Sequence, residues 1–211
     1  MDFVHPVRAV IPGVQGRLLS VLVETTAELS LRTLARLGGV SAAQASRVLP
    51  DLVVLGLVER RDVPPSAMFR LARSNVAAEA VIALARSWET VLERLGAAAG
   101  RMDPAPVSVL VFGSFARREA DRHSDLDVVM VRVNPVDEDD ERWLDSLERW
   151  RTEARAISGN PVEVLEFDRS SVAAKLSVKS REKGSLWHDI VRDAVVVHGI
   201  GLAELRDSVR A

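Results

Sequence analysis

The sequence predicts an α+β protein of two domains, the first mainly helical and the second built on a small mixed sheet with flanking helices. Apolar residues recur at three- and four-residue spacing before residue 56, which is typical of amphipathic helices. Two continuous apolar runs, 107–112 and 126–131, indicate buried strands. We expect a front domain over 1–75, a connecting helix over 76–103 and a rear domain over 104–211.

Three helices are expected in the front domain. Their apolar faces run over residues 16–26, 31–39 and 42–55. Ser30 and Ser41 stand at the starts of the second and third helices, where serine is a common N-cap. A Gly-Gly pair ends the second helix. Pro50 lies inside the third helix and should bend it or weaken its hydrogen bonding locally.

A hairpin follows the three helices. Residues 57–60 and 68–71 flank the turn sequence Asp62-Val63-Pro64-Pro65. Three helices and a hairpin make a winged helix-turn-helix, and this segment resembles the DNA-binding domains of small bacterial repressors. In that fold the third helix enters the major groove and the wing touches the phosphate backbone. The resemblance implies nucleic-acid contacts by Gln44, Arg47, Arg60, Arg61 and Arg70.

Charge is distributed unevenly along the chain. Residues 1–75 carry nine arginines and six acidic residues, whereas the remainder carries 19 basic and 24 acidic residues. A basic front and an acidic rear fit two domains with different tasks. DNA, RNA and protein are all open as partners of the front domain. Winged helices also serve as dimerisation modules, so a homodimer is among the expected assemblies.

The stretch 107–131 carries the chemistry. It reads as a strand, a tight Gly113-Ser114 turn, a short helix and a second strand. Asp125 and Asp127 are two apart on the second strand, so their carboxylates share one face. Two like charges at this spacing favour a divalent cation, and oxygen ligands favour magnesium. The glycine turn lets backbone N–H groups approach a phosphate, so we expect a nucleoside triphosphate site.

These residues also carry a resemblance to a known family. The segments Gly113-Ser114, Ala116-Arg117 and Ser124-Asp125-Leu126-Asp127 resemble the signature of the polymerase-β-type nucleotidyltransferases, and more closely that of the minimal and aminoglycoside nucleotidyltransferases. The resemblance implies that Gly113, Ser114 and Arg117 bind the triphosphate, and that Asp125 and Asp127 hold two magnesium ions. The family usually has glycine after the arginine, where this chain has Arg118, a departure that would reshape the turn or change what the site accepts.

A third carboxylate is expected on the strand 162–167, where the family usually has aspartate. Strand alternation sets Glu163 against its apolar neighbours, while Glu166 has the opposite parity. We take Glu163 as the third ligand, which by the resemblance holds the catalytic metal and helps to deprotonate the acceptor. Glu166 is the weaker candidate.

The helix after this strand carries all the lysines of the chain. Lys175, Lys179 and Lys183 are spaced by four and therefore share one helix face. We assign Lys179 and Lys183 to the triphosphate site, with a nucleic-acid contact and a merely solvated face as alternatives. The acidic run 137–141 is expected to begin a helix, where acids complement the helix dipole, so we predict no metal site there.

Composition excludes several classes of protein. The chain has no cysteine, which rules out disulfides and thiolate metal sites. No apolar run approaches the ~18 residues of a membrane span, and the start lacks the apolar segment of a signal peptide. We therefore expect a cytoplasmic protein with no membrane partner.

The function that the resemblance implies is transfer of a nucleoside monophosphate from a triphosphate, with ATP the first choice, to an acceptor hydroxyl with release of pyrophosphate. Two alternatives stay open. One is a nucleotide-sensing transcriptional regulator with an inactive pocket, and the other is a toxin that modifies tRNA. The sequence does not name the acceptor, which could be an antibiotic, a protein, a tRNA or another metabolite.

Overall fold

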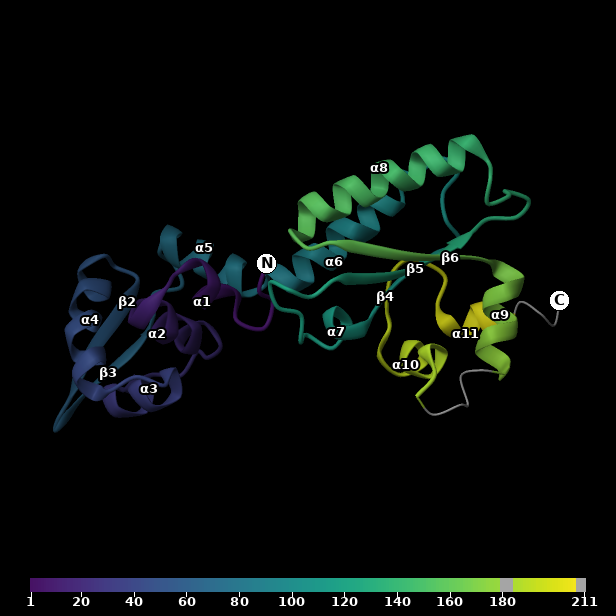
Figure 1. Cartoon of the computed structure of the whole chain (residues 1–211). Coiled ribbons are helices and arrows are strands. Elements are labelled where there is room, and N and C mark those ends of the chain that lie inside the picture. The colour runs from purple at the N-terminus through teal and green to yellow at the C-terminus, as the bar shows by residue number, and fades with distance from the viewer. Residues whose placement is uncertain (179–183, 208–211) are drawn as a thin grey trace. The chain divides into compact units, whose positions relative to one another are not determined.

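A computed structural model describes residues 1–178 and 184–207, and the chain divides into two compact units. The front unit comprises Asp2 and residues 4–87, and the rear unit comprises Met1, Phe3 and the chain from Trp88 onward. The predicted α+β class, with small sheets and flanking helices, is confirmed (Figure 1). Among the described helices, none is both long and apolar enough to cross a membrane.

The front unit holds five helices and a three-stranded antiparallel sheet in the order β1-β3-β2. The helices are α1 (Pro6–Val10), α2 (Gly13–Val23), α3 (Leu31–Gly38), α4 (Ala42–Val54) and α5 (Val76–Ala85). The strands are β1 (Leu29–Ser30), β2 (Val58–Val63) and β3 (Ser66–Leu71). This is the winged-helix arrangement that the sequence predicts, with β2 and β3 as the wing.

Local sequence sets the helix ends of this unit. The Ser30 hydroxyl accepts a hydrogen bond from the backbone N–H of Thr33 at the start of α3. Ser41 and Gln44 form a reciprocal capping box at the start of α4, with Gln44 Oε1 accepting from the Ser41 N–H at 2.9 Å. Gly39 ends α3 in the left-handed conformation, with φ of +64°. The α4 helix runs through Pro50 without interruption.

The expected connecting helix over 76–103 is in fact two helices. Arg86 separates α5 from α6 (Ser87–Ala99). The reason is packing, because the two halves serve different cores. Ala78 and Val81 of α5 are buried in the front core, whereas α6 buries Leu95 and its apolar neighbours in the rear core.

The rear unit is built on a four-stranded mixed sheet in the order β6-β5-β4-β7 (Figure 1). Its strands are β4 (Ser108–Phe112), β5 (Leu126–Arg132), β6 (Val162–Asp168) and β7 (Val195–Gly199). The β5–β6 pair is parallel and the other two pairs are antiparallel. Further helices of this unit are α7 (Gly113–Ala116), α8 (Glu141–Ser158), α9 (Arg169–Val178), α10 (Leu186–Asp193) and α11 (Leu202–Asp207).

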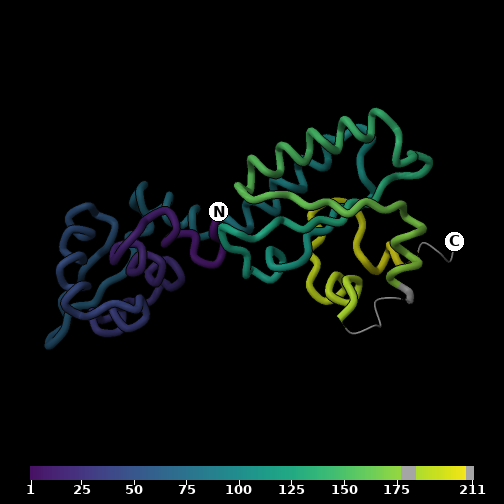
Figure 2. Tube along the Cα trace, viewed as in Figure 1, coloured from purple at the N-terminus to yellow at the C-terminus, as the bar shows by residue number. Residues whose placement is uncertain are grey.

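Helices cover both faces of this sheet, as the chain trace shows (Figure 2). Val128 and Met130 of β5 pack against α6 and α8 in one core. Val129 and Val131 of the same strand pack against α9, α10 and α11 in the other. A strand that is buried on both faces has an unbroken apolar sequence, which explains the runs that predicted β4 and β5.

Candidate functional site

A glycine turn at the end of β4 forms one wall of the site. Gly113 begins α7 with φ of +69°, which is left-handed backbone. A Cβ at this position would lie 2.3 Å from Oδ2 of Asp127, a residue that β5 places opposite Phe112. Glycine is therefore required both by the turn and by the carboxylate that rests against it.

Three carboxylates lie in the neighbourhood of this turn. The parallel pairing of β5 and β6 places Asp127 directly beside Glu163, and Asp125 precedes β5. Burial raises the pKa of the half-buried Asp127, and the negative charges of Asp125 and Glu163 raise it further. The positive charge of Arg117 opposes this rise in the pKa of Asp127. The structure therefore brings the three predicted carboxylates and the predicted arginine into one electrostatic site.

The second glutamate of β6 lies elsewhere. Glu166 accepts a hydrogen bond from the indole N–H of Trp143, which belongs to α8 and the core on that side. Val162 and Val164 pack against the same core. Glu163 has the opposite parity and is exposed on the sheet face that carries Phe167 and the α9–α11 core.

These three carboxylates do not by themselves form a complete metal-binding site. Over residues 1–178 and 184–207, no three His, Cys, Asp or Glu side chains stand close enough together to hold an ion by themselves. The donor set nevertheless fits magnesium. It is all oxygen, it carries a repulsion that a cation would relieve, and magnesium characteristically takes only one or two carboxylates together with waters and phosphates.

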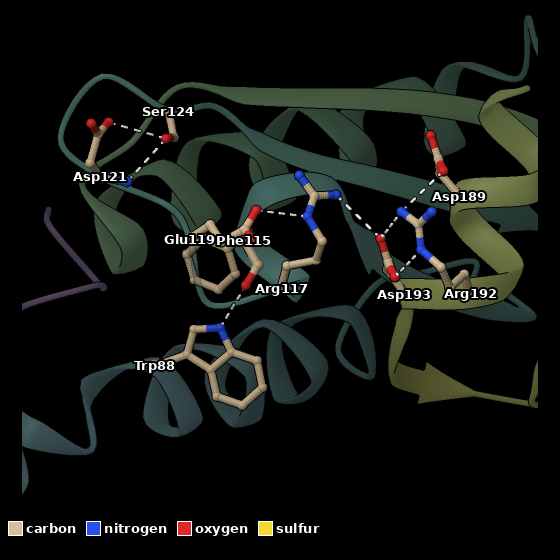
Figure 3. Close-up of polar contacts among 9 residues, drawn as sticks. All are labelled: Trp88, Phe115, Arg117, Glu119, Asp121, Ser124, Asp189, Arg192 and Asp193. Carbon is tan, nitrogen blue, oxygen red and sulfur yellow. Dashed lines mark hydrogen bonds and ion pairs between the residues drawn. The ribbon is translucent and has the colours of Figure 1, made fainter. Parts of the chain in front are cut away.

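A buried asparagine shapes the loop that presents Asp125. Asn160 donates from its amide nitrogen to the carbonyls of Asp121 and Ser124, at 2.9 and 2.7 Å. The Asp121 carboxylate accepts from the His123 N–H and from the Ser124 hydroxyl, and these donors lower the pKa of Asp121. The contact with Ser124 is drawn in Figure 3. No local sequence pattern marks Asn160, because its partners Ser124 and Asp121 lie 36 and 39 residues away.

Arg117 caps α7 and is held by two carboxylates. Its Nε donates to Glu119 at 2.8 Å, and its Nη1 donates to Asp193 of α10 at 3.3 Å (Figure 3). These partners raise the pKa of Arg117, Glu119 having the largest effect. Ser114 is the second residue of α7 and is half-buried.

Arg118, which stands where the family usually has glycine, keeps the backbone conformation of a glycine, with φ of +60°. Its guanidinium lies 4.0 Å from the ring centroid of Trp88 and pairs with Glu89 at 2.9 Å. The Trp88 indole N–H in turn donates to the carbonyl of Phe115 in α7 at 2.7 Å (Figure 3). The departure from the family pattern therefore ties the turn to the first turn of α6.

The structure describes one of the three lysines that follow β6. Lys179 and Lys183 lie outside the residues that the structure describes. The Lys175 ammonium lies 5.2 Å from the Phe167 ring and 5.9 Å from the Trp187 ring, beside the α9–α11 core. Its described contacts are therefore cation–π contacts.

The five residues predicted to contact nucleic acid are exposed on α4 and the wing. Gln44 and Arg47 lie on α4, where Gln44 uses its amide oxygen in the capping box. Each wing arginine is already paired with an acid. These pairs are Arg60–Asp62, Arg61–Glu28 and Arg70–Glu59. Phosphates would have to compete with these carboxylates.

The chain thus joins a winged-helix domain to an α+β domain that carries carboxylates beside a glycine turn. Residues 92–188 match the family model of the nucleotidyltransferase domain, and residues 11–67 match that of the MarR family. Both matches confirm the resemblances inferred from the sequence, so the chain combines a MarR-type winged helix with a nucleotidyltransferase domain. The comparison with curated proteins found no match.

Proposed function

We propose that the chain is a magnesium-dependent nucleotidyltransferase that moves a nucleoside monophosphate from a triphosphate, ATP first among them, to an acceptor hydroxyl and releases pyrophosphate. The observation that supports this most is the position of Asp127, between Asp125 and Glu163 and against the backbone of Gly113. The nucleotidyltransferase match implies transferase chemistry on a nucleoside triphosphate. We place the reaction in the cytoplasm.

Each residue of the site has a role in this proposal. Asp125, Asp127 and Glu163 would hold two magnesium ions, and bound ions would neutralise the charge of the triphosphate and of the departing pyrophosphate. The backbone N–H groups of the turn and the Ser114 hydroxyl would bind phosphate oxygens. Arg117, whose charge lowers the pKa of Asp127, would also bind phosphate oxygens of the triphosphate.

The reaction needs a proton acceptor as well as positioning. The acceptor oxygen forms a bond to the α-phosphorus as the bond to the pyrophosphate oxygen breaks. Glu163 is exposed beside Asp127 and would take the proton that the acceptor hydroxyl releases. Because the groups that bind the triphosphate are provided by rigid strands and a short helix, positioning is expected to carry much of the rate.

We propose duplex DNA as the ligand of the winged helix. The MarR match supports DNA over RNA, and Arg47 is exposed on α4, the helix that would enter the major groove. The paired wing arginines would exchange their carboxylate partners for phosphates. A homodimer is a further proposal, which sedimentation of the whole chain tests directly.

A nucleotide-sensing regulator is the second candidate, because the site is fused to a MarR-type unit and carries glutamate where the family usually has aspartate. Pyrophosphate release in the presence of magnesium separates the two candidates. Glu163→Gln should abolish release yet leave nucleotide binding largely intact, whereas its strand neighbour Glu166→Gln should keep release.

If Glu166→Gln is the inactive variant, the roles assigned to the two glutamates are wrong. If the wild-type chain binds the nucleotide without turnover against any acceptor, the regulator is the better description. Incubation of the chain and a cell extract with triphosphates labelled in the nucleoside or the α-phosphate would identify the acceptor, because that label is transferred with the nucleoside monophosphate.

A further inference from the structure

Asp193, the last residue of α10, connects two arginines at the edge of the site (Figure 3). Its Oδ2 accepts from Nη1 of Arg117 at 3.3 Å and from Nη2 of Arg192 at 2.6 Å, while its Oδ1 accepts from Nε of Arg192 at 2.7 Å. The Asp193 side chain is 11% exposed, far less than that of Asp189, which is 43% exposed and also pairs with Arg192. Asp193 therefore makes a sheltered bridge, while Asp189 makes a solvent-exposed pair.

The carboxylate site, Arg117, Asp193 and Arg192 carry charges of alternating sign. Arg117 ends α7, the short helix that begins against the Asp127 carboxylate and packs on β5, and its charge lowers the pKa of Asp127. Its Nη1 donates to Asp193. A carboxylate behind an arginine orients the guanidinium, yet it also cancels much of the positive charge that a phosphate would meet. Arg192 pairs with both oxygens of Asp193 and offsets that loss. The ionised state of Asp193 is secure, because the two arginines hold its pKa at about 2, Arg192 having the larger effect.

We propose that Asp193 is a positioning residue for the triphosphate: it holds the guanidinium of Arg117 toward the carboxylate site, and Arg192 keeps the charge of Asp193 from neutralising Arg117. The inference rests on the proposed function. It assigns a role to the end of α10, which reaches the site because α10 packs against α7 and β4. Glu119 holds Arg117 from its exposed side, and a bound triphosphate would replace Glu119 as the partner of Arg117.

The test compares Asp193→Asn with the matched control Asp189→Asn, which removes the same charge from the same helix but leaves Arg117 untouched. Two quantities are measured on the full chain: pyrophosphate release against the concentration of magnesium ATP, and equilibrium binding of magnesium ATP. Asp193→Asn should raise the KM and the Kd for ATP about tenfold, as expected when a charge-assisted hydrogen bond no longer aligns a ligand-binding arginine. Its kcat should change less than about threefold, and Asp189→Asn should stay within about twofold on every measure.

A double-mutant cycle distinguishes positioning from a structural role. If Asp193 acts through Arg117, then adding Asp193→Asn to Arg117→Lys should change the KM by less than about twofold. Arg192→Gln supplies a second variant should Asp193→Asn fail to fold, and it should raise the KM because Asp193 is then left to neutralise Arg117.

Three results would overturn the inference. They are equal behaviour of Asp193→Asn and Asp189→Asn, a loss in kcat with an unchanged KM, or fully additive effects in the cycle with Arg117→Lys. Failure of the proposed function looks different: the wild-type chain itself would then neither bind magnesium ATP nor release pyrophosphate, and the inference would be overturned with it.

Discussion

Replacing Gly113 with alanine should damage the site far more than the fold. A non-glycine residue in left-handed backbone costs about 1–2 kcal/mol, and Gly113 has φ of +69°. The added Cβ would also lie 2.3 Å from Oδ2 of Asp127 and 3.2 Å from its Cγ. Since comfortable contacts lie near 3.5 Å, the carboxylate must move by roughly 1 Å. A displacement of that size in a catalytic group can lower the rate by about 10²-fold.

Gly13→Ala is the matched control for this prediction. Gly13 has φ of +79° and no neighbouring atom within 4 Å of an added Cβ, so it reports the backbone effect alone. Thermal or denaturant unfolding of both variants should show losses of similar size, about 1–2 kcal/mol each, read from the transition of the unit that carries the substitution. Only Gly113→Ala should lose pyrophosphate release. Full turnover in Gly113→Ala would refute the close packing of the Asp127 carboxylate against the turn.

Three further predictions concern the metal site, the turn and the wing. Because burial and neighbouring acids raise the pKa of Asp127, the folded state binds its proton more tightly than the unfolded state, and ionising Asp127 destabilises the metal-free fold as the pH rises past the ordinary aspartate value. Near pH 7 and without magnesium, Asp127→Asn should therefore have a higher melting temperature than the wild type. Added magnesium should not raise that melting temperature further, and turnover should fall by over ~10²-fold. A melting temperature of Asp127→Asn that magnesium still raises would count against Asp127 as a metal ligand. Arg118→Gly should change the free energy of unfolding by less than about 1 kcal/mol, because glycine relieves the left-handed backbone strain and so offsets the lost cation–π and ion-pair contacts. Arg118→Ala keeps the strain and should lose about 1 kcal/mol in the same unfolding assay. A large loss of stability in Arg118→Gly would contradict this balance. Glu28→Gln frees Arg61 on the wing, whereas the control Glu24→Gln removes a charge without freeing a wing arginine. At low salt, Glu28→Gln should therefore bind duplex DNA several-fold more tightly than Glu24→Gln. Equal DNA titration curves for the two variants would argue against wing contacts.

Much of the fold was predictable because its signals are local. The caps at Ser30 and Ser41 and the left-handed end of α3 at Gly39 depend on residues within a few positions of one another, and all three are present in the structure. The apolar runs of β4 and β5 predicted buried strands for the same reason. The connecting helix was wrong in its continuity, because its two halves pack into different cores, and no local pattern records which core an alanine-rich helix will join.

The candidate site shows the same division. Strand alternation alone separated Glu163 from Glu166, and the register of β5 with β6 then set Glu163 beside Asp127. By contrast, the sequence showed that Arg118 replaces the glycine usual in the family but did not indicate its side-chain contacts. Its contacts are with Trp88 and Glu89, which lie about thirty residues earlier in the chain.

The sequence by itself determined the two domains, the glycine turn and the carboxylates that face it, because helical spacing, strand parity and turn chemistry act over a few residues. Only the tertiary structure decided which charges meet. It paired Arg61 with Glu28, 33 residues away, and Arg117 with Asp193, 76 residues away. Such pairs follow from how strands and helices pack, and many acids in the chain could equally have served either arginine. The wing arginines are thereby paired with acids, and α10 supplies Asp193 as a partner of Arg117.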